Sequence, residues 1–109
     1  MRLVSTDTIS GFDVRHGGVV HACAVSGANV LRDMREAITN TLGGQMSRYE
    51  ELLDRTIARA LESLSERAQA AGYDAVVCVR VSHPEIVQGA IEIVVTGTGV
   101  WLDKHASGA

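Results

Sequence analysis

Two side chains that can bind a metal ion stand two residues apart in the N-terminal half of the chain. His21 and Cys23 lie within a segment rich in β-favouring residues, 12–25. Because side chains alternate between the two faces of a strand, residues at this spacing point to the same side. A thiolate beside an imidazole suits a soft ion such as zinc or copper(I). The pair therefore predicts part of a metal site.

A closed zinc site takes four ligands, and this pair supplies only two of them. The chain has one other cysteine, Cys78, and no CxxC or HxxxH motif. We take Cys78 as the third candidate ligand, with His16, His83 or symmetric copies of the chain as further sources. The competing interpretation makes Cys23 a small core residue and His21 a surface or interface residue.

Two further groups of residues could bind a ligand. Asn29, Arg32 and Asp33 lie together at a predicted helix start. They could form a polar cluster that binds a ligand or another subunit. Alternatively, Asn29 caps the helix and the charge of Asp33 compensates the helix dipole. Trp101, the only tryptophan, could stack a planar ligand such as a flavin between subunits, or pack at an interface.

No motif places a nucleophile beside a base, and segment 97–99 lacks the third glycine of a phosphate loop. The sequence thus predicts no enzymatic activity.

Length and composition describe a small globular domain. The chain has 109 residues, of which 46% are apolar, and a net charge of −3. We expect a single domain over 1–109, with a core over about 3–102 and a flexible tail at 103–109. The acidic charge and the lack of a Lys/Arg cluster argue against nucleic-acid binding. Since no apolar run could span a membrane or form a signal peptide, we expect a cytoplasmic protein with no membrane partner and reduced cysteines.

Helical periodicity appears in the middle of the chain. The segment 47–50, Ser-Arg-Tyr-Glu, has the capping-box pattern and predicts a helix that starts at Arg48. Gly72 follows the expected last helical residue, Ala71, and is a suitable C-terminal cap. Apolar residues at helical spacing also predict a shorter preceding helix over 30–42.

The remaining segments favour strands. We expect a short extended lead-in at 3–10, and strands at 12–25 (bent or bulged at Gly17-Gly18), 75–82 and 90–102. In strand 75–82, alternation places Val77, Val79 and Val81 on one face. The last two strands are apolar on one side, as in an antiparallel sheet with one covered face. The predicted fold is α+β, with an antiparallel sheet packed against one long helix plus the shorter preceding helix.

The pairing of the last two strands can be predicted from their connection. A hairpin centred near Ile86 would place Arg80 opposite Glu92 and Val81 opposite Ile91. The Arg–Glu pair would contribute a few tenths of a kcal/mol, about the value for opposed charges across strands.

The predicted elements are long for a chain of this size. A helix over 48–71 would measure about 36 Å, and a strand over 90–102 about 43 Å. A compact 109-residue monomer has a radius of gyration of only about 13 Å. Elements of this length leave sheet edges and sheet faces uncovered, and a second copy of the chain could cover them. We therefore expect a homo-oligomer. The alternative is a monomer with a kinked helix and a bent ribbon.

Short pieces along the chain resemble the YbjQ-like family in their order and spacing. These pieces are Gly18-Val19-Val20, Ser26-Gly27-Ala28-Asn29, Arg32-Asp33, Gly43-Gly44, Tyr49-Glu50, Gly72 followed by Asp74-Ala75-Val76-Val77, and Thr96-Gly97-Thr98. The resemblance covers roughly residues 3–102. It implies a helix packed on an antiparallel sheet, a homopentameric ring, and the heavy-metal-binding label of these small prokaryotic proteins. The chain departs from the family pattern at Tyr73 and Cys78, where small alanine and glycine are common.

The residues and the resemblance together predict a ring-forming, heavy-metal-binding oligomeric module. The alternative is an oligomeric scaffold or small-ligand-binding module with no metal requirement. In either case the partner is the chain itself, most simply as a pentamer. Any site would lie between subunits, because one chain supplies too few ligands.

Overall fold

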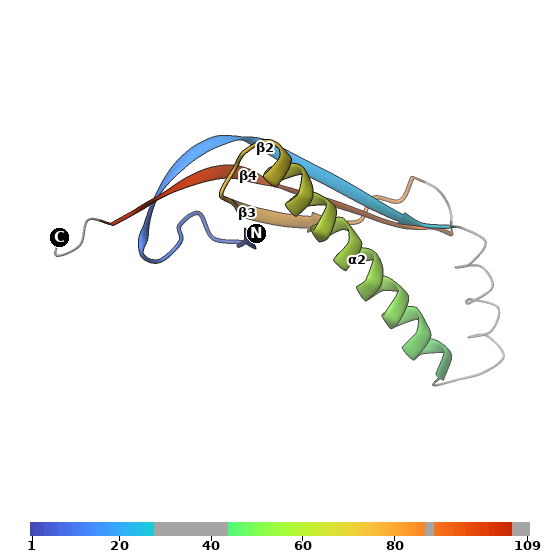
Figure 1. Ribbon diagram of the computed structural model, residues 1–109. Coiled ribbons are helices and arrows are strands. Elements are labelled where there is room, and N and C mark those ends of the chain that lie inside the picture. Colours follow the sequence, from blue (N-terminus) through green and yellow to red (C-terminus); the bar gives the residue numbers. More distant parts are fainter. Residues whose placement is uncertain (28–43, 87–88, 106–109) are drawn as a thin grey trace.

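The computed structural model describes residues 1–27, 44–86 and 89–105 of the chain. Its elements are β1 (Arg2–Leu3), β2 (Phe12–Ser26), α2 (Gly44–Ala70), β3 (Ala75–Ser82) and β4 (Ile91–Lys104). The four strands form one sheet in the order β1-β3-β4-β2, and α2 crosses one face of it (Figure 1). The α+β class predicted above is therefore confirmed. The predicted helix over 30–42 lies outside the described residues.

The sheet is mixed rather than antiparallel throughout, which corrects the prediction. β1 pairs in parallel with β3, with Arg2 opposite Ala75. The chain continues along β3 beyond β1, because Val79 N–H donates to Val4 O at 3.0 Å and Cys78 N–H donates to Thr6 O at 2.9 Å. The expected lead-in thus forms part of the sheet, and it covers an edge of β3 that would otherwise be unpaired.

β2 and β4 form a long antiparallel ribbon that runs the length of the molecule. Their pairing extends from Phe12 opposite Lys104 to Ser26 opposite Ile91. The register shifts between His16 and Val19, so the predicted irregularity at the two intervening glycines is confirmed. This ribbon makes the protein elongated, with principal extents of 63 × 25 × 18 Å.

Helix α2 begins earlier than predicted and ends at Ala70, one residue before the predicted Ala71. It starts at Gly44 instead of Arg48, so Ser47 lies inside the first turn and is not its cap. At the other end, Gly72 has φ = +88°, and its N–H donates to Gln69 O while Tyr73 N–H donates to Ala68 O. These two bonds form a Schellman cap. Within the described part of the chain, no helix is both long and apolar enough to cross a bilayer.

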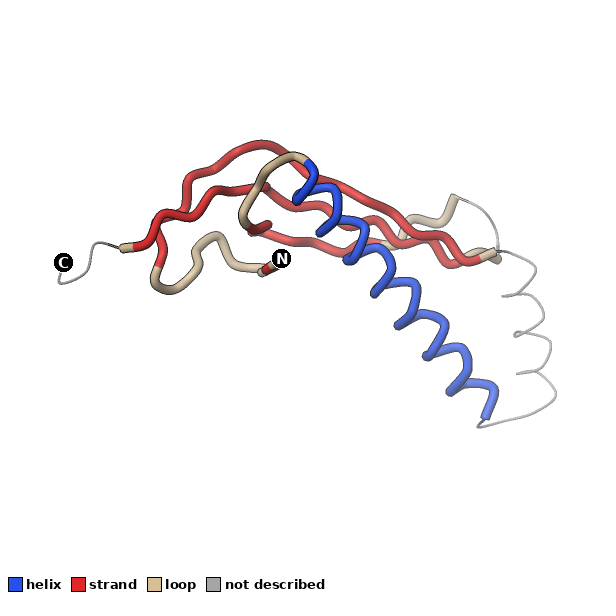
Figure 2. Tube along the Cα trace, in the orientation of Figure 1, coloured by secondary structure: helices blue, strands red, loops and turns tan. Residues whose placement is uncertain are grey.

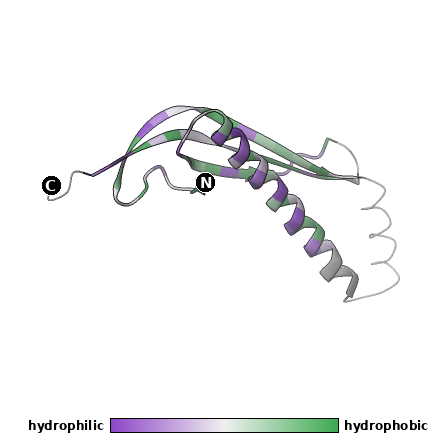
Figure 3. Cartoon of the chain, viewed as in Figure 1, coloured by the Kyte–Doolittle hydropathy of each residue, from purple (hydrophilic) through white to green (hydrophobic). Residues whose placement is uncertain are grey.

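The main core lies between the C-terminal half of α2 and the sheet (Figure 2). Ala60, Leu64 and Ala68 are fully buried on the helix. They pack against alternate residues of the long ribbon, which are Val20, Ala22 and Ala24 on β2 and Ile91, Ile93 and Val95 on β4. Figure 3 shows the corresponding apolar stretches along the strands and hydrophilic patches recurring along α2. Small alanine side chains occupy contact positions on both the helix and β2.

A second, smaller core lies on the opposite face of the sheet. Ile9 packs there against Ala75, Val77 and Val100. Ile9 belongs to the segment between β1 and β2, which folds across this end of the sheet. The N-terminal segment therefore covers one end of the face that α2 leaves open.

The predicted register of β3 and β4 is wrong. Val81 pairs with Val95 and Arg80 with Thr96, so neither Ile91 nor Glu92 is their partner. The loop after β3 is longer than a tight hairpin, and Glu92 instead accepts a hydrogen bond from the backbone N–H of Ile86 at 2.8 Å. The strands are consequently offset by four residues from the expected pairing.

A β-bulge in β3 also changes which residues share a face. The register shifts between Val77 and Arg80, and Cys78 adopts φ = +55°. As a result Val77 packs in the Ile9 cluster whereas Val79 packs against the main core. The expectation that Val77, Val79 and Val81 share one face is therefore wrong, because the bulge adds a residue to the alternation.

Candidate functional site

The predicted ligand pair lies on the sheet face opposite α2. In the ribbon register, Val19, His21, Cys23 and Val25 of β2 stand beside Thr98, Thr96, Val94 and Glu92 of β4, respectively. These residues alternate with the ones that pack under the helix, so they point away from it. The N-terminal segment covers only the Val100 end of this face. At the other end Glu92 is buried and bonded to the loop after β3. We call the part between these two ends, defined by the other seven residues, the open face.

His21 and Cys23 are both exposed on the open face. The structure thus confirms that the two side chains share one side of the strand. Cys23 does not lie in the core of the chain, so that half of the competing interpretation is wrong, whereas its other half, which places His21 at the surface, agrees with the structure. Unpaired cysteines are among the most often buried residues in proteins.

Cys78 does not join this pair. It is half-buried and packs with the Ile9 cluster. It lies on β3, which is separated from β2 by the whole of β4, and two strand spacings amount to about 9–10 Å. Among the described residues, no group of three or more His, Cys, Asp and Glu side chains is arranged to hold a metal ion.

Two arginines of α2 block the outer edge of β2 beside the open face. Arg67 Nη1 donates to His21 O at 2.9 Å, and Arg59 Nη2 donates to Val25 O at 3.2 Å. Eight helical residues rise about 12 Å, which matches the roughly 13 Å spanned by four strand residues. The spacing of Arg59 and Arg67 along the helix therefore matches the spacing of the Val25 and His21 carbonyl groups along the outer edge of β2. Capped carbonyls make this edge a poor template for another strand.

Trp101 is held by contacts within the chain. Its ring centroid lies 5.1 Å from that of Tyr73 at an interplanar angle of 49°, and the Arg15 guanidinium lies 5.1 Å from the indole centroid. Its Nε1–H donates to Gly72 O at 3.2 Å. The indole thus contributes to the fold by aromatic and cation–π packing. The other predicted ligand cluster, Asn29, Arg32 and Asp33, lies outside the described residues.

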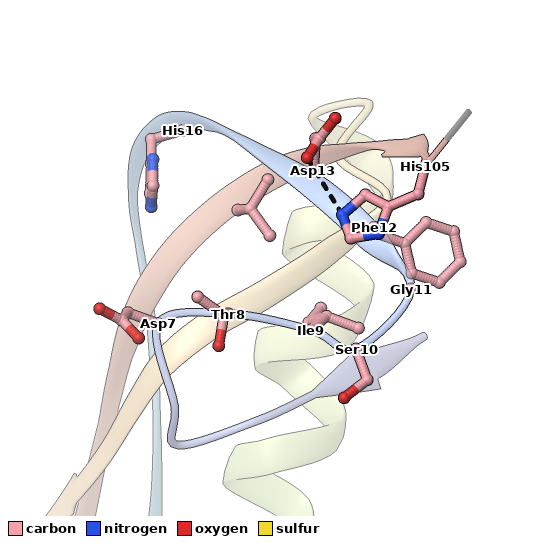
Figure 4. Close-up of a pocket in the computed structure, with 10 residues that line it drawn as sticks. Asp7, Thr8, Ile9, Ser10, Gly11, Phe12, Asp13, His16 and His105 are labelled. Carbon is pink, nitrogen blue, oxygen red and sulfur yellow. Dashed lines mark ion pairs between the residues drawn. The ribbon is translucent and has the colours of Figure 1, made fainter. Parts of the chain in front are cut away.

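A surface pocket that the sequence analysis missed lies under the segment between β1 and β2 (Figure 4). Its volume is about 480 Å³. Polar groups line it, among them Asp7, Asp13, His16 and His105. His105 Nε2 lies 3.1 Å from Asp13 Oδ1, and both side chains are largely exposed. His105 lies within the predicted flexible tail, directly after the last residue of β4, Lys104.

Comparisons with known proteins agree on one family. Residues 1–103 match the family model YbjQ_1, described as "Putative heavy-metal-binding". The UPF0145 protein OE_4416R of Halobacterium salinarum is 38% identical over 103 residues, covering 94% of this chain and 99% of that protein. A UPF0145 protein of Carboxydothermus hydrogenoformans is 31% identical over 106 residues, covering 96% and 99%.

The fold also has a counterpart among solved structures. A Pediococcus pentosaceus protein of unknown function from the DUF74 family superposes with a TM-score of 0.62 at 15% identity, covering 94% of this chain and 98% of that one. At this identity the similarity concerns the fold alone. The family model spans nearly the whole chain, and the relatives are matched over almost their full length. The chain therefore belongs to the YbjQ family, whose curated members here are UPF0145 proteins.

Proposed function

We propose that this protein is a homo-oligomeric module that binds a soft heavy-metal ion, zinc or copper(I). The observation that carries the proposal is the exposed His21–Cys23 pair on the open face. Imidazole nitrogen and thiolate sulfur are the ligands that these ions prefer. The description of the matching family model points to the same chemistry. Cysteines serve as ligands only when reduced, so we place the protein in the cytoplasm.

The shape of the chain supports the oligomeric part of the proposal. Its radius of gyration is 17.9 Å, against about 13 Å for a compact chain of this length. Its accessible surface is 7031 Å², against about 5,800 Å² for a compact monomer of this mass. The excess is comparable to the area that stable protein interfaces bury. We extend the proposal to a ring of five subunits on the basis of the family resemblance.

The ligand count supports a site that subunits share. One chain presents two suitable ligands on the open face, whereas a closed site needs four. Assembly would supply the missing ligands from a neighbouring copy. Metal binding and oligomerisation would then be coupled, each strengthening the other.

The experiment measures metal content and mass on protein purified without a histidine tag. We expect zinc or copper(I) to bind with at least micromolar affinity and native mass spectrometry to show an oligomer. Cys23→Ser should lose the metal, whereas the matched control Cys78→Ser should keep it. A metal affinity that stays millimolar, or a monomeric mass at micromolar concentration, contradicts the corresponding half of the proposal.

The pocket beside Asp13 and His105 favours a second candidate function, a scaffold or small-ligand-binding module without a metal requirement. A cavity of about 480 Å³ is within the range that small molecules occupy. This alternative predicts that chelator-treated protein keeps its oligomeric state and retains a small polar compound after purification. Mass spectrometry of denatured protein would reveal that compound, and its loss in Asp13→Asn would place it in the pocket.

A further inference from the structure

We infer that two copies of the chain enclose one soft metal ion, held by His21 and Cys23 of both copies where their open faces pack together. This inference rests on the proposed function and specifies its ligands, its stoichiometry and the surface that carries them. The site would be incomplete in either copy alone.

Within one chain, the two side chains can reach the same ion. Residues two apart on a strand are separated by about 6.5–6.8 Å along its axis. His21 and Cys23 stand on one face, in a stretch of β2 that lies beyond the bulge and pairs in regular register with β4. Metal–ligand distances of about 2.0–2.3 Å let both side chains bind an ion placed above and between them.

Across two chains, the spacing of packed sheets fits the same ion. Sheets that pack face to face lie about 10 Å apart, so the midplane is about 5 Å from each backbone. A cysteine sulfur bound to zinc brings the ion to roughly that height. Two copies related by a two-fold axis would contribute two imidazoles and two thiolates, which is a tetrahedral His₂Cys₂ set.

Charge favours a divalent ion in this set. Each Cys23 thiol loses a proton to become a ligand, so two protons are released for each ion bound. Two thiolates and one Zn²⁺ then sum to zero charge, which suits an ion withdrawn from water between two sheets. Copper(I) would leave one uncompensated negative charge. We therefore expect zinc to be the preferred ion.

The residues around His21 and Cys23 favour a second copy of the chain as the partner that covers the open face. Val19 and Val25, which flank the pair, are 79% and 50% exposed. Arg59 and Arg67 bind two carbonyls of the neighbouring strand edge, which makes that edge less suitable for pairing with another strand than the face is for packing. A contact through the same patch on both chains joins them in pairs. In an assembly of five-membered rings it would join one ring to another.

The first experiment titrates zinc into reduced, metal-free, tag-free protein. We expect one zinc for every two chains, two protons released per zinc, and a doubling of the assembly mass that EDTA reverses. Cys23→Ser and His21→Gln should each weaken zinc binding by about 100-fold or more and abolish the doubling. The control Cys78→Ser should behave as the unsubstituted protein.

The second experiment uses oxidation of metal-free protein to test whether the Cys23 side chains of two copies can meet. Diamide accepts the two electrons and two protons released when two Cys23 thiols join, so it should give a disulfide-linked dimer in Cys78→Ser but none in Cys23→Ser. One zinc per chain that is unaffected by Cys23→Ser would overturn this inference while leaving a metal-binding function in place. An oligomer whose mass is the same with and without zinc, and in which Cys23 does not cross-link, would also overturn this inference. Oligomerisation itself would then still stand.

Discussion

The ring of Tyr73 occupies the space that a side chain on Gly99 would fill. A Cβ atom added to Gly99 would lie 2.3 Å from Tyr73 Cδ2, and one added to Gly17 would lie 2.3 Å from Tyr73 Cε1. The phenol oxygen accepts a hydrogen bond from Gly18 N–H at 2.9 Å. The Tyr73 ring therefore packs across both strands of the ribbon, against Gly17 of β2 and Gly99 of β4.

Substitution of Gly99 by Ala should destabilise the protein. The added methyl group would force Tyr73 off the ribbon, at a cost of about 1–3 kcal/mol in the free energy of unfolding. Urea denaturation would measure this loss. Gly27→Ala is the control, because a Cβ there meets nothing within 4 Å, and it should change stability by less than about 0.5 kcal/mol.

Removal of the Tyr73 ring should make Gly99→Ala tolerable. In the Tyr73→Ala background the added methyl group no longer meets the ring, so the two substitutions should be strongly non-additive. An equal cost of Gly99→Ala in both backgrounds would show that the ring is not the obstacle.

Cys78 adopts a backbone conformation that favours glycine, with φ = +55°. At an ordinary strand position, Gly is less stable than Ala by about 0.5–1 kcal/mol. At position 78 the left-handed conformation costs a side chain about 1–2 kcal/mol. We therefore expect Cys78→Gly to be at least as stable as Cys78→Ala in thermal unfolding. Ser82, exposed in the same strand, should show the usual order, with Ser82→Ala more stable than Ser82→Gly.

Ser26 and Thr56 form a buried pair of hydroxyls between β2 and α2, 2.7 Å apart. Thr56 donates its single proton to Leu52 O at 2.7 Å, so Ser26 must donate to Thr56. Thr56→Val removes the acceptor and should cost about 1–3 kcal/mol, because a buried hydroxyl is left unpaired. Ser26→Ala should cost less, and Ser26→Ala/Thr56→Val should cost less than the sum of its parts. Additive effects in denaturant unfolding would argue against the coupling.

Arg59 and Arg67 should protect the edge of β2 from pairing with other chains. The double variant Arg59→Ala/Arg67→Ala exposes the carbonyls of Val25 and His21, and we expect faster aggregation on heating. Light scattering during heating, at the same protein concentration for each variant, would measure the rate of aggregation. Arg2→Ala/Arg55→Ala, at two other exposed positions, removes the same number of positive charges and is the control for charge loss. Equal aggregation of the double variant and the control would rule out the protective role.

Local features were predicted well from sequence because they depend on nearby residues. The bounds of β3, the irregularity at Gly17-Gly18 and the cap at Gly72 all follow from backbone preferences and short-range periodicity. The start of α2 was missed because the capping-box pattern also occurs inside the first turn of the real helix. A pattern of three or four residues cannot show whether the chain before it is already helical.

The relations between distant segments were decided only in the folded chain. The bulge at Cys78 and the parallel pairing of the N-terminal segment with β3 were not predicted. Neither leaves a periodic signal, because a bulge is one extra residue and a short parallel strand resembles any extended segment. The pocket beside Asp13 and His105 likewise joins residues from the two ends of the chain.

By itself, the sequence determined that His21 and Cys23 share one face of a strand, since alternation along a strand is a local property. Tertiary structure alone decided which face that is. The burial of Val20, Ala22 and Ala24 under α2 turns the intervening residues toward the open face. The physical reason is that burying apolar surface against a distant helix orients the whole strand, and only the packed helix identifies the buried side.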